Sequence, residues 1–277
     1  MERLLIAGFG DIAGRALAQL EARFEVIRLA RRYGFDLDRP QSLALERVNR
    51  VLHLAPPARA GAEDRRTANL LATLEKGRIL PARIVYVSTS GVYGDCAGAR
   101  VDEGRPAAPR TDRARRRADA ERQLAAWCGA RAVDLVILRV PGIYAAERLP
   151  LERLRAGVPV LRAEDDVYTN HIHAEDLVAS LVRAVEDGAP AGTFNICDDS
   201  EIMMGDWLDL VADRAGLPRP PRIARAGAAG RIPPELFSFM GESRRLDNRR
   251  MKRELGIRLR YATVQDGLRN ENAVGVD

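Results

Sequence analysis

The stretch that decides the fold is RLLIAGFGDIAGR, at Arg3–Arg15. A short apolar run ends at a glycine, and apolar residues at helical spacing follow, which predicts a strand, a tight turn and a helix. The turn fits the pattern G-x-G-x-x-[G/A] at Gly8, Gly10 and Ala13. Here Gly8 permits the turn, Gly10 lets the backbone approach a pyrophosphate, and Ala13 keeps the helix close to the strand.

This turn is a candidate dinucleotide site, because the first N–H groups of the following helix lack intrahelical partners and carry the positive end of its dipole. The alternative is a glycine turn in an α/β protein that binds no nucleotide. The residues that we expect at the cofactor are Gly8, Phe9, Gly10, Asp11, Ile12 and Ala13.

Strands and helices alternate outward from this stretch through the first half of the chain. The alternation predicts an α/β fold, a Rossmann-type doubly wound parallel sheet with helices on both faces. Ligands of such sheets bind beyond the carboxyl ends of the strands. The further expected strands are Phe24–Ala30, Arg50–Pro57, Arg83–Ser90 and Val133–Val140. The expected helices are Asp11–Arg23, Thr67–Leu74 and Asp112–Gly129.

The rhythm breaks after Pro141, where Pro, Gly and Arg clusters separate shorter segments. This break predicts a smaller C-terminal substrate lobe over the ligand edge of the sheet. The later expected elements are a strand in Gly192–Asp199 and helices at Asp206–Gly216 and Asn248–Leu255. We expect residues 1–145 to form the nucleotide-binding domain with 170–200 returning to it, and residues 146–169 and 201–277 to form the lobe.

Composition narrows the classes of protein. The 277 residues are 46% hydrophobic, as in a globular protein with a core, and no apolar run reaches the roughly 18 residues of a membrane span. The start of the chain resembles a buried strand rather than a signal peptide, so we expect a cytoplasmic protein. The net charge is +5, but only two of the 44 basic residues are lysines. The arginines therefore reflect compositional bias, and we expect no nucleic-acid partner.

Cysteine and histidine usage excludes two further kinds of site. Cys96, Cys128 and Cys197 are odd in number and lack C-x-x-C spacing, which favours free thiols in a reducing compartment. The three histidines have no matching set of ligands around them, so we expect no metal site.

The end of the second expected strand bears on cofactor choice. A site that prefers NAD usually places an acidic residue there for the ribose 2′-hydroxyl. This chain has Arg31 and Arg32 instead, and guanidinium groups suit a 2′-phosphate. We therefore favour NADP, with NAD possible. The alternative is a pair of solvated loop arginines.

The segment VSTSGVYGD, at Val87–Asp95, ends the fourth expected strand with a cluster of hydroxyl side chains. In this architecture such a cluster lies near the nicotinamide of a bound dinucleotide. The alternative is a set of polar residues that cap a turn.

Together these residues resemble the extended and atypical short-chain dehydrogenase/reductase family, which includes NAD(P)-dependent epimerases and dehydratases. The similarity covers most of the chain. Its motifs are GFGDIAG at Gly8–Gly14, FDL at Phe35–Leu37, LAPP at Leu54–Pro57, STSGVYG at Ser88–Gly94, LRVPGIY at Leu138–Tyr144, NHIHAEDLV at Asn170–Val178 and FNICDD at Phe194–Asp199.

The resemblance implies roles for further residues. The position of Asp36 binds the adenine amine, with Leu37 beside it, and Thr89 matches the catalytic hydroxyl. Further implied cofactor contacts are Ala55, Pro56, Pro141, Gly142 and Ile143. The implied substrate contacts are Tyr144 and His171.

The largest departure from the family falls on its Y-x-x-x-K motif. Counting back from Ala120–Glu121, which match the A-E pair after the lysine, places Arg117 at the lysine position and Arg113 at the tyrosine position. Arginine has a pKa above about 12, so Arg113 is no general base at neutral pH. Arg117 still suits a ribose hydroxyl, so cofactor binding is expected to survive while catalysis is altered. Alternatively, these arginines belong to solvated pairs such as Asp112–Arg116.

Two readings of function stay open. One is an oxidoreductase or epimerase/dehydratase-like enzyme for a small carbonyl or sugar-like substrate, in which another group replaces the tyrosine. Tyr144 and His171 are candidates, whereas His173 fits a helix cap better. The other is a non-catalytic nucleotide-binding or redox-sensing protein. A homodimer is possible, and Arg244, Arg245 and Arg249 face either an anionic substrate or solvent.

Overall fold

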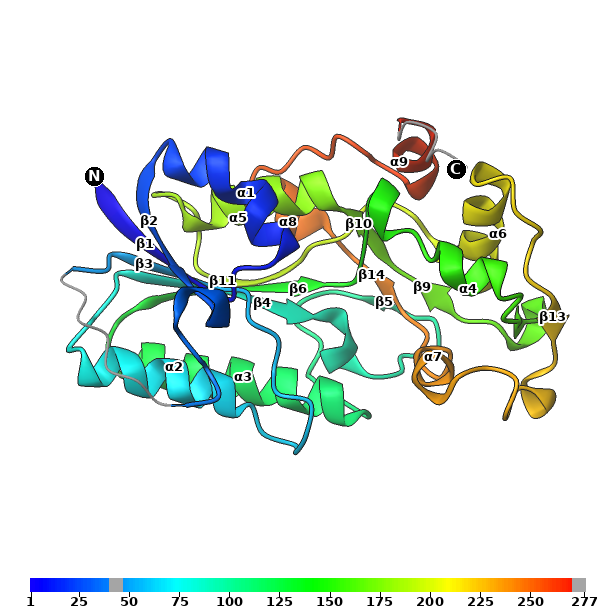
Figure 1. The fold of residues 1–277 in the computed structure, drawn as a ribbon, viewed down its shortest axis with the longest axis horizontal. Coiled ribbons are helices and arrows are strands. Elements are labelled where there is room, and N and C mark those ends of the chain that lie inside the picture. The colour runs from blue at the N-terminus through cyan, green and yellow to red at the C-terminus, as the bar shows by residue number, and fades with distance from the viewer. Residues whose placement is uncertain (40–46, 271–277) are drawn as a thin grey trace.

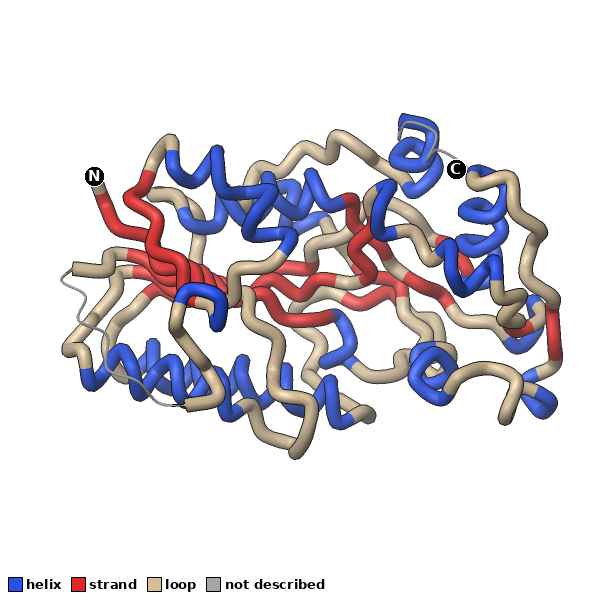
Figure 2. The backbone as a smooth tube through the Cα atoms, viewed as in Figure 1, coloured by secondary structure: helices blue, strands red, loops and turns tan. Residues whose placement is uncertain are grey.

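A six-stranded parallel sheet forms the centre of the protein in a computed structural model that describes residues 1–39 and 47–270 (Figures 1 and 2). Its strand order is β11-β6-β4-β3-β1-β2, and every neighbouring pair is parallel. The doubly wound sheet predicted from the sequence is confirmed. The strands are β1 (Glu2–Ala7), β2 (Phe24–Leu29), β3 (Arg50–His53), β4 (Arg83–Thr89), β6 (Asp134–Val140) and β11 (Gly192–Asn195).

The chain changes direction across the sheet at β1. It passes first to β2 on one side of β1 and then to β3 on the other, which opens a crevice at the carboxyl ends of β1 and β3. Ala7 lies opposite His53, and the Ala7 carbonyl accepts hydrogen bonds from the N–H groups of Leu54 and Ala55. The glycine turn after β1 therefore emerges beside the chain that leaves β3.

Helices cover both faces of the sheet, as Figure 1 shows. Helices α1 (Asp11–Glu21) and α5 (Ala174–Val185) lie on one face, and α2 (Arg65–Lys76) and α3 (Asp112–Gly129) lie on the other. Side chains cap three of them, because exposed first-turn N–H groups need acceptors. The capping side chains are Asp64 for α2, Thr111 for α3 and His173 for α5, as predicted for His173.

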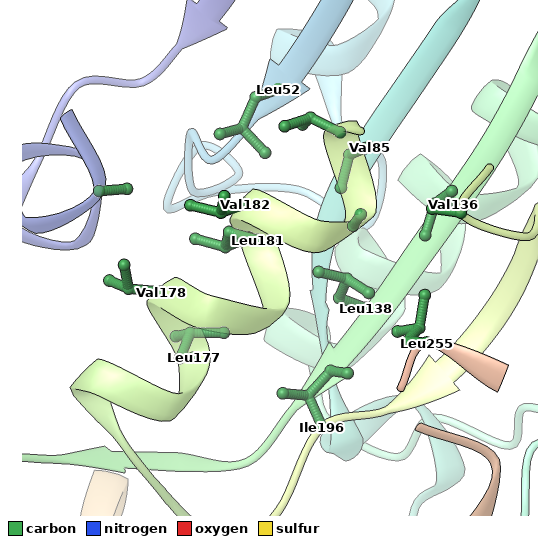
Figure 3. Packing of buried hydrophobic residues seen from close by; sticks show 14 of the residues in the cluster. Leu52, Val85, Val136, Leu138, Leu177, Val178, Leu181, Val182, Ile196 and Leu255 are labelled. Atoms are coloured by element: carbon green, nitrogen blue, oxygen red, sulfur yellow. The ribbon is translucent and has the colours of Figure 1, made fainter. Parts of the chain in front are cut away.

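The larger core cluster lies between α5 and the sheet (Figure 3). Four apolar side chains of α5 recur at helical spacing and face the strands, where branched residues of β3, β4 and β6 meet them. Burial of this stripe holds residues from the second half of the chain against the first half. The four are Leu177, Val178, Leu181 and Val182.

The later elements form a separate cluster beyond the carboxyl ends of the strands, at the right of Figure 1. Its core includes Tyr144, Trp207 and Met240. Four short strand pairs, separate from the six-stranded sheet, also lie in this half of the molecule or join it to the segments after β4 and β6. They are β7 (Gly142–Tyr144) with β10 (His171–His173), β9 (Tyr168–Thr169) with β12 (Ile202–Met203), β8 (Val160–Leu161) with β13 (Arg222–Ile223), and β5 (Arg100–Val101) with β14 (Arg245–Leu246). The helices of this part are α4 (Leu151–Arg155), α6 (Met204–Arg214), α7 (Pro234–Phe239) and α9 (Val264–Asn270), while α8 (Arg249–Glu254) packs on β11.

Two simple absences apply to residues 1–39 and 47–270. No helix there is long and apolar enough to cross a membrane. No group of three or more His, Cys, Asp and Glu side chains gathers there at metal-binding distance. The three cysteines are free and buried, as their spacing predicted.

Candidate functional site

The first of two cavities along the carboxyl edge of the sheet has a volume of about 260 Å³ and lies at the glycine turn. Gly8 has a φ of +92°, which disfavours any other residue. A Cβ on Gly8 would lie 2.3 Å from the backbone nitrogen of Ala55, so the turn and the chain after β3 meet without a side chain between them. The lining residues include Gly8, Phe9, Gly10, Ala55 and Pro56.

Gly10 precedes α1 and leaves the amino end of the helix open. No side chain caps α1, and a Cβ on Gly10 would meet nothing within 4 Å. Ala13 is 1% exposed and packs into the core beneath the turn. Of the other predicted contacts, Asp11 pairs with Arg15 and Arg148, and Ile12 packs against the core. The first N–H groups of α1 therefore have no side-chain cap, which leaves them for an anion beside the cavity.

The structure separates the two arginines that follow β2. Arg31 lines the first cavity together with Asp36 and Leu37. Arg32 instead donates from Nη2 to the Phe9 carbonyl at 3.0 Å and stacks over the Phe9 ring at 5.1 Å. Arg31 therefore is the member of the pair that lines this cavity.

A second arginine in the first cavity was missed in the sequence. Arg66 lies in the first turn of α2 and lines the cavity. It forms a bidentate contact with Asp38, at 2.6 and 2.8 Å, which lowers the pKa of Asp38. No motif marks Arg66, because only the packing of α2 against the loop after β2 brings it here.

The second cavity, of about 190 Å³, lies beyond β4 and β7. Thr89 ends β4, lines the cavity and accepts a hydrogen bond from the Gly91 N–H at 3.3 Å. Pro141 and Gly142 form the opposite wall, where the Gly142 N–H donates to the Asn170 carbonyl at 3.1 Å. Ile143 packs against the core instead. The cavity is lined by Thr89, Ser90, Gly91, Arg113, Pro141, Gly142, Tyr168, Thr169, Asn170, Met204, Phe239, Glu242 and Arg244.

The sequence model of the NAD dependent epimerase/dehydratase family matches residues 19–197, which is more than half of the chain. The chain belongs to this family. GDP-6-deoxy-D-mannose reductase from Pseudomonas aeruginosa is 25% identical over 246 aligned residues, with 77% of this chain and 80% of that protein covered.

Solved structures share the fold over nearly the whole length. A functionally unknown conserved protein from Silicibacter pomeroyi superposes with a TM-score of 0.80 and 28% identity, over 97% of each chain. RMD from Pseudomonas aeruginosa, solved in complex with NADPH, superposes with a TM-score of 0.74 and 18% identity, again over 97% of each chain.

Arg113, which the sequence predicts at the family's tyrosine position, lines the second cavity. Arg113 lies in the first turn of α3, and its guanidinium carbon sits 4.0 Å from the centre of the Phe239 ring. This stacking holds the side chain of a helix on the sheet against α7 in the C-terminal cluster. Arg113 therefore bridges the two parts of the molecule, and its match to the family's proton donor stays a prediction.

The arginine at the family's lysine position turns into the protein. Arg117 donates from Nη1 to the Val87 carbonyl at 2.8 Å and to the Tyr86 hydroxyl at 3.1 Å. Burial raises the pKa of Tyr86 to about 12, so the phenol is neutral and accepts this bond. Arg117 lies against β4 and is not among the described residues that line either cavity. Its contact with a cofactor stays a prediction.

The expected Asp112–Arg116 pair is wrong. Asp112 pairs with Arg115 at 2.7 Å, whereas Arg116 is 8% exposed and donates to the Gly61 carbonyl at 2.6 Å. The reason is that this face of α3 packs against the loop before α2 instead of facing solvent. A helix made of alternating charges gave no sign of which face is buried.

A buried ion pair lies next to the end of β4 that carries Thr89 to the second cavity. Glu121 on α3 receives two hydrogen bonds from Arg139 on β6, at 2.7 and 3.2 Å, and one from the Ser88 hydroxyl at 2.5 Å. Side-chain exposure is about a tenth for both charged residues. The network joins α3 to the carboxyl ends of β4 and β6, one residue before Thr89.

The two predicted substrate residues lie behind the second cavity, not on its surface. Tyr144 is 2% exposed and packs edge-on against Trp207, with 5.4 Å between ring centres. His171 stacks on the same indole at 4.3 Å. Burial lowers the pKa of His171 to about 3, so the ring is neutral at physiological pH. Neither is among the described residues that line this cavity, and their contact with a substrate stays a prediction.

The charged wall of the second cavity was only partly visible in the sequence. Arg244 and Glu242 form an ion pair at 3.0 Å, and Arg244 also donates to the Gly94 carbonyl at 2.8 Å. Arg245 and Arg249, considered with Arg244 as candidates, pair with Glu201 and Asp247 instead. Only the fold selects Arg244 from this run of arginines.

Proposed function

We propose that this protein binds NADP(H) and acts as an oxidoreductase, or an epimerase/dehydratase-like enzyme, on a small carbonyl or sugar-like compound. The observation that carries the proposal is the pair of cavities on one edge of the sheet. The first is lined by Gly8 and Gly10, and the second by Thr89 and Gly142. When bound, the nicotinamide would supply or accept hydride. Membership in the NAD dependent epimerase/dehydratase family supports this assignment.

The first cavity suits a dinucleotide. The uncapped amino end of α1 and the open space at Gly10 fit a pyrophosphate, which no side chain would obstruct. Asp36 and Leu37 would line the adenine. The preference for NADP rests on Arg31 and Arg66, whose charges border the cavity where a 2′-phosphate would lie. The related RMD structure contains NADPH.

The proposal includes altered acid–base chemistry. Thr89 retains a hydroxyl that can hydrogen-bond a substrate oxygen in the second cavity. Arg113 keeps its proton at neutral pH and replaces the family's general acid with a fixed positive charge. General acid–base catalysis contributes typically about 10²–10⁴-fold, so turnover is expected to be slow unless another group moves the proton.

A second candidate function is nucleotide binding without turnover, for structure or redox sensing. Two observations favour it. Arg113 stands where the sequence motif predicts the proton donor, and His171, a candidate replacement, is buried and neutral.

Thermal unfolding with NADPH, with NADH and without addition tests the proposal. A nucleotide at about 100 times its dissociation constant should stabilise the fold by roughly 2.7 kcal/mol. We expect a larger shift with NADPH than with NADH. No shift with either nucleotide would reject the proposal, and a larger shift with NADH would reject the cofactor preference.

The double variant Arg113→Tyr/Arg117→Lys separates the two candidate functions. Reductase activity that appears only in the double variant would indicate a binding protein derived from an enzyme. Turnover by the natural sequence would show that another group supplies the proton. Single variants serve as controls, because the family mechanism needs both residues.

A further inference from the structure

We propose that the second cavity binds a small hydroxylated carboxylate, with Arg113 as the carboxylate-binding residue. The inference rests on the proposed function only in placing the reaction at this cavity. It assigns Arg113 a binding role and names the chemical class of the substrate. Three properties of the described lining residues carry it: an unpaired cation, a buried donor and acceptor without partners, and a small volume.

Arg113 brings a positive charge that the protein leaves uncompensated at short range. The structure of residues 1–39 and 47–270 gives this guanidinium no ion pair and no hydrogen bond, only the Phe239 ring at 4.0 Å. Glu235 and Glu242 act on it from farther away. By contrast, its neighbour Arg115 pairs with Asp112 on the same helix. Stacking on Phe239 leaves the N–H edge of Arg113 available for a planar carboxylate.

Glu242 and Arg244 supply unused polar atoms in the same wall. Both side chains are about nine-tenths buried. Glu242 Oε1 and Arg244 Nε have no hydrogen-bond partner among the described residues, although the other oxygen and another nitrogen pair with each other. An unsatisfied buried polar group costs about 1–3 kcal/mol. Both atoms are shielded from solvent in this structure, so a ligand that donates to Glu242 and accepts from Arg244 would remove this cost through a small shift of the two side chains toward the cavity.

These atoms define complementary groups on the ligand. Oε1 of Glu242 can accept a hydrogen bond from a ligand hydroxyl, and Nε of Arg244 can donate one to a ligand oxygen. The planar guanidinium of Arg113 can pair with an anion that has two oxygens in one plane. A carboxylate with a neighbouring hydroxyl satisfies all three. The carbon that bears this hydroxyl, or the corresponding carbonyl, would then lie in the cavity that Thr89 lines.

The volume of the cavity limits the size of the ligand. At about 190 Å³ it is smaller than the roughly 300–1,000 Å³ of pockets that hold drug-sized molecules. A nucleotide sugar, which exceeds that size, would extend out of this space. A short hydroxy acid fits within it.

Binding of linear aldonates from glycerate to gluconate, each compared with its neutral carboxamide, tests the inference by calorimetry. The titrations are done with and without saturating NADPH. We expect at least one aldonate to bind at millimolar concentration and its carboxamide to bind at least tenfold more weakly. Propanoate, which lacks hydroxyls, should also bind more weakly than glycerate.

Variants locate the site. Arg113→Gln should weaken aldonate binding about 10–100-fold, the equivalent of a charged hydrogen bond, while Arg113→Lys restores part of it. Glu242→Gln should reduce discrimination between glycerate and propanoate. Arg115→Gln is the matched control on the same helix and should bind like the natural protein, and circular dichroism checks that each variant is folded.

Three results would overturn the inference: no aldonate binding in either condition, equal affinity for acid and amide, or unchanged aldonate affinity in Arg113→Gln. Tighter, Arg113-independent binding of GDP-mannose or UDP-glucose would likewise reject the size argument. If NADPH does not bind, only the proposed function is rejected. The aldonate titrations without cofactor still test ligand binding in the second cavity.

Discussion

The two cavities along the sheet edge are built in different ways. At its centre the first is shaped by backbone, where the glycine turn at Gly8 meets Ala55 after β3 and Gly10 leaves the end of α1 open. The second is built from side chains far apart in the sequence, including Thr89, Arg113 and Glu242. A backbone site tolerates drift in neighbouring side chains, whereas a side-chain site changes chemistry with each substitution. This difference would let one chain keep the family's nucleotide motif while the predicted tyrosine and lysine positions carry arginine.

The largest effect is expected where buried charge supports the second cavity. Glu121→Leu leaves Arg139 buried without its partner and should lower the free energy of unfolding by about 3–5 kcal/mol. Denaturant titration measures this loss. The double variant Glu121→Leu/Arg139→Met should recover most of it, because an apolar pair replaces the stranded charge. If Glu121→Leu lowered the free energy of unfolding by less than about 1 kcal/mol, the ion pair would contribute little to the stability of this region.

A side chain added to the backbone of the first cavity should lower both stability and NADPH binding. Gly8→Val adds a side chain against Ala55 at a φ of +92°, so we expect a loss of about 2–4 kcal/mol in stability. The thermal shift with NADPH should disappear in the same variant. Gly14→Ala is the control within α1, where a Cβ meets nothing within 4 Å, and should stabilise by about 0.5–1 kcal/mol. A retained NADPH shift in Gly8→Val would place the nucleotide elsewhere.

Acid should weaken the packing behind the second cavity. The pKa of His171 is about 3 in the folded protein, below its value of 6.5 when unfolded, so the neutral ring stabilises the fold above pH 6.5. This contribution is lost as pH falls below 6.5, by about 2 kcal/mol at pH 5. His171→Phe should therefore lose less stability than the natural protein between pH 7 and pH 5. Equal losses would mean that His171 takes up its proton without cost.

The smallest effect is expected at the rim of the first cavity. Arg31→Gln should weaken NADPH binding about tenfold and leave NADH binding unchanged, because only NADPH carries the 2′-phosphate. Fluorescence titration with both nucleotides measures the ratio. Arg32→Gln is the matched control and should leave that ratio unchanged, since Arg32 contacts Phe9. If only Arg32→Gln changed the ratio of NADPH to NADH affinity, Arg32 and not Arg31 would be the residue that binds the 2′-phosphate.

Much of the fold was predictable, because strands and helices of a parallel α/β sheet carry local signals. The predicted helix Asp112–Gly129 agrees with α3, and the predicted strand in Gly192–Asp199 is β11 at the edge of the sheet. The site was predictable only where one motif holds it. Tyr144 and His171 follow family motifs yet pack on Trp207, since the sequence does not report which way a short strand faces.

The sequence alone determined the glycine turn, the order of strands and helices, the family, and the presence of arginine where a tyrosine and a lysine are expected. These are local or positional properties, which adjacent residues encode directly. Tertiary structure decided that Arg113 lines a cavity while Arg117 lies against β4, and that Glu242 and Arg244 join Thr89. Such contacts depend on how distant elements pack, and a charged side chain carries no local mark of the surface that it will face.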